Sequence, residues 1–163
     1  MGCDIHAYIE SVRDGYVKSV AHVGIDRDYT LFGVLAGVRE EPALVKPRGI
    51  PLNLGWQSKD EYCLFITENT SENPSHYVTR EQAEKWVKSK SSEMYDKSYV
   101  TDPDAHTPSW LTTDEVKLCC EEYVRRSHTK DRRNSDLDAI YAMMEVYRKA
   151  RDGEVRFVFW FDN

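Results

Sequence analysis

The sequence lacks a long apolar run and lacks an excess of basic side chains. No stretch approaches the roughly 18 consecutive apolar residues of a membrane-spanning helix, so we expect no membrane segment. The formal net charge is −6 at pH 7, which argues against broad binding to duplex DNA because such binding needs a basic face. No signal peptide is recognised before the first predicted strand, and we therefore expect a cytoplasmic protein.

Cysteine is also scarce, and its spacing argues against two common kinds of site. None of the four cysteines belongs to a C-x-x-C pair, so neither a zinc ribbon nor a redox-active dithiol is predicted. Free and mostly buried thiols in a reducing compartment are expected instead.

The residues that are present suffice for one folded domain. The chain has 163 residues, of which 40% are hydrophobic and 12% are aromatic. A chain of this length can bury a proper core, and we expect a single domain over residues 1–163.

Alternating apolar and polar residues predict strands at both ends of the chain. Residues 3–12 and 16–23 alternate on either side of the turn signal at Gly15, which predicts a β-hairpin. Residues 154–163 alternate phenylalanine with valine and tryptophan, as in a central strand that is covered on both faces. We expect this strand to pair with the N-terminal hairpin, and a further strand is predicted over residues 61–67.

Helices are predicted from N-caps and from apolar spacing. The expected N-caps are Asp28, Thr79 and Thr112, and a further helix is expected over about 135–151. Residues 40–56 and 89–108 are expected to form loops, and Trp110 is also expected to lie in a loop. The predicted fold is α+β, a small and mainly antiparallel sheet covered on one face by about three to four helices.

Two Asp-x-His pairs are the sharpest candidates for chemistry. Asp4 and His6 share one face of the first predicted strand, and Asp104 and His106 lie in a Pro-rich segment a hundred residues later. Carboxylate and imidazole together suit Zn, Mn or Fe, which would activate water for hydrolysis. Alternatively, His6 and His106 form a metal-free acid/base pair, with Asp4 assisting. The remaining interpretation is that these residues are polar surface.

A group of arginines predicts an anion site. Arg27, Arg39 and Arg48, with Lys46 beside them, are close in sequence, and Arg48 lies in the rigid turn "PRGIP". Arginine binds phosphate and carboxylate through a planar, bidentate fork. In an acidic protein such a group favours a small, nucleotide-sized anion over a polymer, although Arg39 also suits the end of a helix.

Several blocks together resemble a family of small proteins that tailed bacteriophages and prophages encode. The blocks are "MGCDIH", "RDYTLFGVLAGVR", "PRGIP", "HTPSWLT" and the C-terminal "FWFDN". They run from the first residue to the last, but residues 57–100 and the basic segment near 130 carry none of them. The resemblance implies the cytoplasm of an infected bacterium as the setting, and it supplies no reaction. It singles out Asp4, His6, Arg27, Arg39, Arg48, His106, Ser109 and Trp110.

Two functions are predicted from these features. The first is a small phosphodiesterase-like hydrolase that acts on a nucleotide or another phosphorylated small molecule, for example a bacterial cyclic-nucleotide defence signal. Its catalytic residues would be Asp4, His6 and His106, and its substrate-binding residues Arg27, Arg39, Arg48, Ser109 and Trp110. The alternative is a binding protein without catalysis, which sequesters such a signal or inhibits a host defence protein.

Overall fold

The computed structural model describes residues 2–39, 42–69, 75–129, 132–150 and 153–163. The larger sheet contains β1 (Asp4–Arg13), β2 (Tyr16–His22), β7 (His106–Thr112) and β8 (Glu154–Asp162). The smaller sheet contains β3 (Cys63–Ile66), β4 (Tyr77–Val78), β5 (Met94–Asp96) and β6 (Tyr99–Thr101). The helices are α1 (Tyr29–Ala36), α2 (Trp56–Tyr62), α3 (Arg80–Lys88), α4 (Thr113–Arg126) and α5 (Ser135–Ala150).

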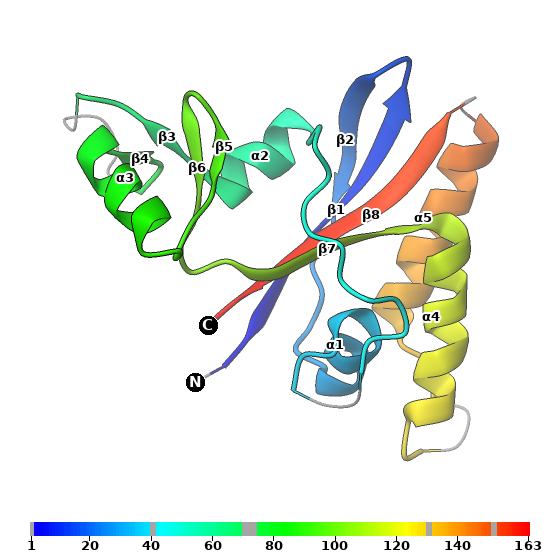
Figure 1. Cartoon of the computed structure of the whole chain (residues 1–163). Coiled ribbons are helices and arrows are strands. Elements are labelled where there is room, and N and C mark those ends of the chain that lie inside the picture. Colours follow the sequence, from blue (N-terminus) through cyan, green and yellow to red (C-terminus); the bar gives the residue numbers. More distant parts are fainter. Residues whose placement is uncertain (1, 40–41, 70–74, 130–131, 151–152) are drawn as a thin grey trace.

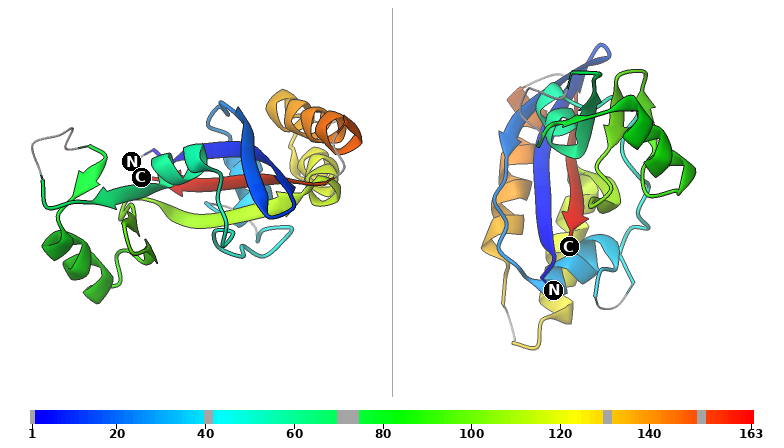
Figure 2. Two further views of the ribbon diagram at one scale, coloured as in Figure 1. Left: turned by 90° about the horizontal axis from the view of Figure 1, so that it is seen from above. Right: turned by 90° about the vertical axis from the view of Figure 1, so that its left-hand side faces the viewer.

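The larger sheet is antiparallel and is built around the C-terminal strand. Its order is β2-β1-β8-β7, so β8 pairs with the N-terminal hairpin as predicted. The register sets Asp4 opposite Asp162, and the two chain ends lie side by side in both views of Figure 2. The α+β prediction is confirmed.

One face of the larger sheet carries the main hydrophobic core. Ile5, Ala7 and Ile9 of β1 and alternate phenylalanines of β8 are buried there. They pack against α1, α4 and α5, which lie together on this side of the sheet (Figure 1). The expected layer of helices on one face therefore exists.

The opposite face is covered by α2, which the sequence did not predict, and by β3, which lies within the strand expected over residues 61–67. Tyr8 and Trp160 pack there against Tyr62 of α2 and Cys63 of β3, which attaches the smaller sheet to the larger one. That sheet is mixed, with the order β4-β3-β6-β5 and a parallel pairing of β3 with β4.

Three boundary predictions were wrong. The expected loop 89–108 contains β5, β6 and the start of β7. The strand expected over 61–67 begins only at Cys63, because α2 precedes it. Trp110, expected in a loop, lies within β7.

The predicted N-caps are confirmed. The Asp28 carboxylate accepts the Leu31 N–H, and the Thr79 hydroxyl accepts the Gln82 N–H. Thr112 forms a capping box with Glu115 at the start of α4. Within the described residues, no helix is both long enough and apolar enough to cross a membrane.

Candidate functional site

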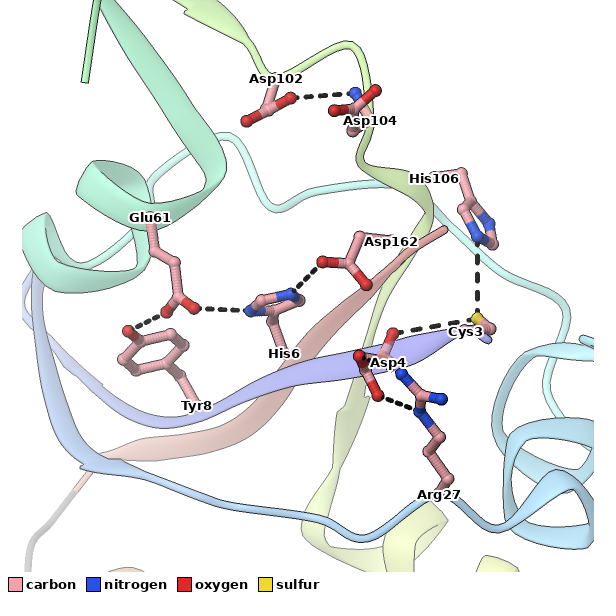
Figure 3. Close-up of polar contacts among 10 residues, drawn as sticks. All are labelled: Cys3, Asp4, His6, Tyr8, Arg27, Glu61, Asp102, Asp104, His106 and Asp162. Atoms are coloured by element: carbon pink, nitrogen blue, oxygen red, sulfur yellow. Dashed lines mark hydrogen bonds and ion pairs between the residues drawn. The ribbon is translucent and has the colours of Figure 1, made fainter. Parts of the chain in front are cut away.

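The polar row of β1 forms a chain of hydrogen bonds with α2 and the end of β8. The Tyr8 hydroxyl donates to one oxygen of Glu61, whose other oxygen lies 2.6 Å from His6 Nδ1. His6 Nε2 lies 3.0 Å from an oxygen of Asp162. Figure 3 shows this order from Tyr8 to Asp162. Both nitrogens of the imidazole therefore already have carboxylate partners.

These carboxylates set the charge of His6. The hydrogen bond with Glu61, supported by Asp162, raises the pKa of His6 to about 9 against the opposing effect of burial. His6 is therefore protonated at neutral pH, and both ring N–H groups donate. Burial raises the pKa of Glu61, but the hydrogen bonds from His6 and Tyr8 more than compensate, so that this pKa is lowered. The arrangement is a charge-paired contact between α2 and the larger sheet.

Asp4 has a different partner from its neighbour His6. Arg27 Nε lies 2.5 Å from one carboxylate oxygen of Asp4, and Arg27 Nη2 lies 2.7 Å from the other. The fork that was predicted to hold substrate phosphate thus grips a carboxylate of the same chain. This pairing also lowers the pKa of Asp4, through the hydrogen bond from Arg27.

His106 lies on the other face of the sheet from His6. Its Nε2 is 3.9 Å from the Cys3 sulfur, and its ring stacks on Phe161 with 5.9 Å between centroids. Cys3 and Phe161 belong to the core beneath the helices, whereas His6 stacks on Trp160 on the opposite face. The predicted acid/base pair of His6 and His106 is therefore not formed.

The four suggested metal ligands do not surround one point. Asp104 is exposed, and its backbone N–H donates to Asp102 Oδ1 at 2.9 Å, away from both histidines in Figure 3. Asp4 is bound to Arg27, and the histidines face opposite sides of the sheet. In the part of the chain that the structure describes, no group of three or more His, Cys, Asp or Glu residues is placed to hold a metal ion.

A cleft of about 610 Å³ lies between the larger and the smaller sheet. One side is the segment 48–52, which we call the strap, and Gly49 N–H ties it to the Pro108 carbonyl of β7 at 3.1 Å. The opposite side comes from residues 90–95 and 101, and Tyr62 and residues 105–108 complete the lining. His106 and Arg48 both line this cleft.

Arg48 is held in a fixed position at the edge of the cleft. Its guanidinium carbon lies 4.3 Å from the centroid of the Trp110 ring, and Nη2 lies 2.5 Å from Glu115 Oε1. The backbone N–H of Arg48 donates to the Ser109 hydroxyl at 3.3 Å. The structure thus brings together three of the predicted binding residues, Arg48, Ser109 and Trp110. Arg39 lies elsewhere, 5.8 Å from the Tyr29 ring centroid.

Sequence reasoning missed several residues of these two sites. Asp162 could have been found, because it follows Trp160 by two residues on a predicted strand and so shares its face. Glu61 carried no such signal, since α2 was not recognised. Ser92 and Tyr95 of the cleft fell in the segment that was expected to be a loop.

Comparison of the chain with protein-family models, with curated proteins and with solved structures gives no match.

Proposed function

We propose that the chain binds a small phosphorylated ligand of the nucleotide class in the cleft beneath the strap. The observation that carries this proposal is the fixed guanidinium of Arg48 at the edge of a cleft of about 610 Å³. Clefts of a few hundred to about 1,000 Å³ are typical of small-molecule sites.

The fixed position of Arg48 favours anion binding for an entropic reason. An arginine side chain loses rotamer freedom when it grips a ligand, and stacking on Trp110 has already removed much of that freedom. Glu115 is itself anchored, because its second oxygen accepts the Thr112 N–H at 2.8 Å. A guanidinium has five N–H donors, and the described contact with Glu115 uses one of them.

Other groups of the cleft suit the same ligand. Lys90 adds a second cationic side chain, and Ser91, Thr101 and Thr107 add hydroxyl groups. A phosphate accepts hydrogen bonds from all of these groups. In the infected bacterium that the phage resemblance implies, a cyclic-nucleotide defence signal belongs to this ligand class, and sequestering it requires no catalysis.

Hydrolysis of the bound ligand is a second candidate function, favoured by the presence of His106 in the same cleft as Arg48. Histidine is the side chain best suited to proton transfer near neutral pH. In this scheme His106 takes a proton from water as the water oxygen attacks phosphorus. The ester P–O bond then breaks, and the leaving oxygen takes up the proton that His106 holds, which restores the neutral imidazole. His6 and Asp4 take no part.

One incubation separates the two functions. The protein is mixed with a panel of linear and cyclic nucleotides, first at one-hundredth of the ligand concentration and then at equal concentration. Turnover at the low ratio supports hydrolysis, and His106→Ala should then abolish turnover while binding remains. Depletion only at equal concentration, with intact ligand recovered on heating, supports sequestration. Failure of every phosphorylated compound to bind contradicts both functions.

Arg48→Lys tests the proposed phosphate contact, because an ammonium group cannot reproduce the bidentate fork. A hydrogen bond to a charged group is worth about 1.5–3 kcal/mol, so we expect roughly ten- to a hundredfold weaker binding by calorimetry. The matched control is Arg133→Lys, which changes an exposed arginine that forms a fork with Asp138 outside this cleft. Equal affinity of Arg48→Lys and the parent protein would remove the phosphate assignment.

A further inference from the structure

The cleft has an apolar part that a phosphate group alone cannot explain. Leu52 is fully exposed at 101% of its reference area, Met94 is 42% exposed, and both line the cleft. A single exposed apolar residue is ordinary, but apolar side chains gathered in one concave site indicate contact with something apolar. Ile50, Tyr62, Tyr95 and Ala105 line the same cleft.

Tyr95 fixes the place where this apolar part lies. Its hydroxyl donates to the Leu52 carbonyl at 3.3 Å and accepts the Leu54 N–H at 3.1 Å. The strap is thereby fastened to β5, which also carries Met94. Leu52 and Met94 are therefore brought to the same region, where the strap meets the smaller sheet.

The strap carries its charged residue, Arg48, at one end and its apolar residue Leu52 at the other. Arg48 and Leu52 are four residues apart, and even a fully extended chain would place their Cα atoms at most about 14 Å apart. A ligand that contacts both side chains must carry an anionic group and an apolar group in one small molecule. A nucleoside phosphate has this combination, whereas a sugar phosphate has only the anionic group.

Ser92 provides a second indication of a ligand with polar edges. It lines the cleft and is 6% exposed, and its hydroxyl has no hydrogen-bond partner among the residues that the structure describes. Buried hydroxyl groups are normally paired. A heterocyclic base carries donors and acceptors on its edges and can supply the partner.

Building on the proposed function, we propose that the ligand is a nucleoside phosphate whose base lies against Leu52 and Met94 and whose phosphate lies at Arg48. The base is then the part of the ligand that the cleft selects. A sugar phosphate would keep the contact with Arg48 and lose the rest.

Calorimetry with defined probes tests the base contact. The probes are AMP, GMP, CMP and UMP, with ribose 5-phosphate as the compound without a base and adenosine as a compound without phosphate. We expect at least one nucleotide to bind ten times or more tightly than ribose 5-phosphate. If ribose 5-phosphate binds as tightly as every nucleotide, this inference is overturned while the proposed anion site stands. If adenosine binds as tightly as AMP, the phosphate contact fails, and both proposals fall. If no probe binds, this inference is overturned, whereas the proposed function falls only when the cyclic nucleotides of the wider panel also fail to bind.

A variant and a matched control test whether the base of the ligand contacts Leu52. Leu52→Ser should weaken binding of the preferred nucleotide about tenfold and leave ribose 5-phosphate binding unchanged. Leu52 is fully exposed, so the variant should fold as the parent does. The control is Leu118→Ser, which changes a half-exposed leucine on α4 and should alter neither affinity. Nucleotide binding by Leu52→Ser that equals the parent's overturns the placement of the base.

Discussion

Glu10 shows how a charged side chain is accommodated inside the larger sheet. It is fully buried, and one carboxylate oxygen accepts two hydrogen bonds from Arg156, at 2.9 and 2.7 Å. The other oxygen accepts the Gly55 N–H at 2.8 Å and the Ser58 hydroxyl at 2.7 Å. Four donors thus replace the water that the carboxylate loses on folding.

Arg156→Ala should destabilise the protein strongly, because it leaves the Glu10 carboxylate buried without its cation. Removing one partner of a buried ion pair costs about 3–5 kcal/mol, which urea unfolding will measure. Arg133→Ala is the control, since this arginine pairs with Asp138 at the surface and exposed pairs contribute little. Equal effects of the two substitutions would contradict the burial argument.

Gly55→Ala should also destabilise the protein, for a steric reason. A Cβ at this position would lie 2.8 Å from the Glu10 oxygen and closer still to the Ser19 hydroxyl. The contact with Glu10 displaces the carboxylate of the buried ion pair, and the contact with Ser19 displaces a neighbouring hydroxyl. Gly24→Ala is the matched control, because a Cβ there meets nothing within 4 Å. We expect a lower melting temperature for Gly55→Ala and an unchanged or slightly raised one for Gly24→Ala.

The start of α4 links a helix cap to the candidate binding cleft. Thr112 caps the helix and exchanges hydrogen bonds with Glu115, which in turn holds Arg48. Thr112→Ala should cost about 0.5–2 kcal/mol of stability, read from the unfolding midpoint. Lys117→Ala changes an exposed position on the same helix and should change the midpoint much less. A loss equal to that of the control would mean that the cap contributes nothing.

Elements with a strong local signal could be predicted from the sequence. The N-terminal hairpin, the caps at Asp28 and Thr112, and the alternating strand β8 all depend on residues close together in the chain. Strands β4, β5 and β6 have two or three residues each, which is too short for a period of two to be recognised. Helix α2 begins after Gly55 without a side-chain cap, so its start carried no signal.

The candidate site was predictable only in part, because strand register decides which side chains meet. Arg48, Ser109 and Trp110 were selected by type and motif, and the structure brings them together. His106 was expected beside His6, but the register sets it opposite Phe161, and the pairing is irregular between His106 and Ser109. Thr107 has a positive φ of 49° there. Such a break in alternation is invisible to pattern analysis. It turns His106 to the face away from His6, on an edge strand where His106 also lines the cleft.

At the scale of the whole molecule, His6 of the larger sheet contacts Glu61 of α2, the helix that leads directly into β3 of the smaller sheet, and also Asp162 of the neighbouring strand β8. The pKa of His6 is raised from 6.5 to about 9 in the folded protein. A raised pKa means that the folded state holds the proton more tightly than the unfolded state does. The stabilisation is therefore fully present below about pH 6.5 and is lost as the pH rises through about 9.

His6→Gln should remove this pH-dependent part of the stability. The difference in unfolding free energy between the parent and His6→Gln should be on the order of 1–2 kcal/mol at pH 6, because partial exposure screens the pairs. It should decrease between pH 6.5 and pH 9.5. Urea unfolding at several pH values measures it, with His76→Gln, at an exposed position, as the control. A difference that grows with pH would show that His6 is not held in its protonated form.

The central position of β8 has a consequence for the time at which this chain can fold during its synthesis. Residues 154–162 follow every other element in the chain, yet they separate β1 from β7 and supply three phenylalanines of the main core. Ribosomes add about 5–20 residues per second, so β1 leaves the exit tunnel many seconds before its neighbour is made. The hairpin and helices must wait with their apolar faces uncovered. Nascent chains stalled before residue 154 should therefore bind chaperones, whereas chains extended until β8 has emerged should be released from them.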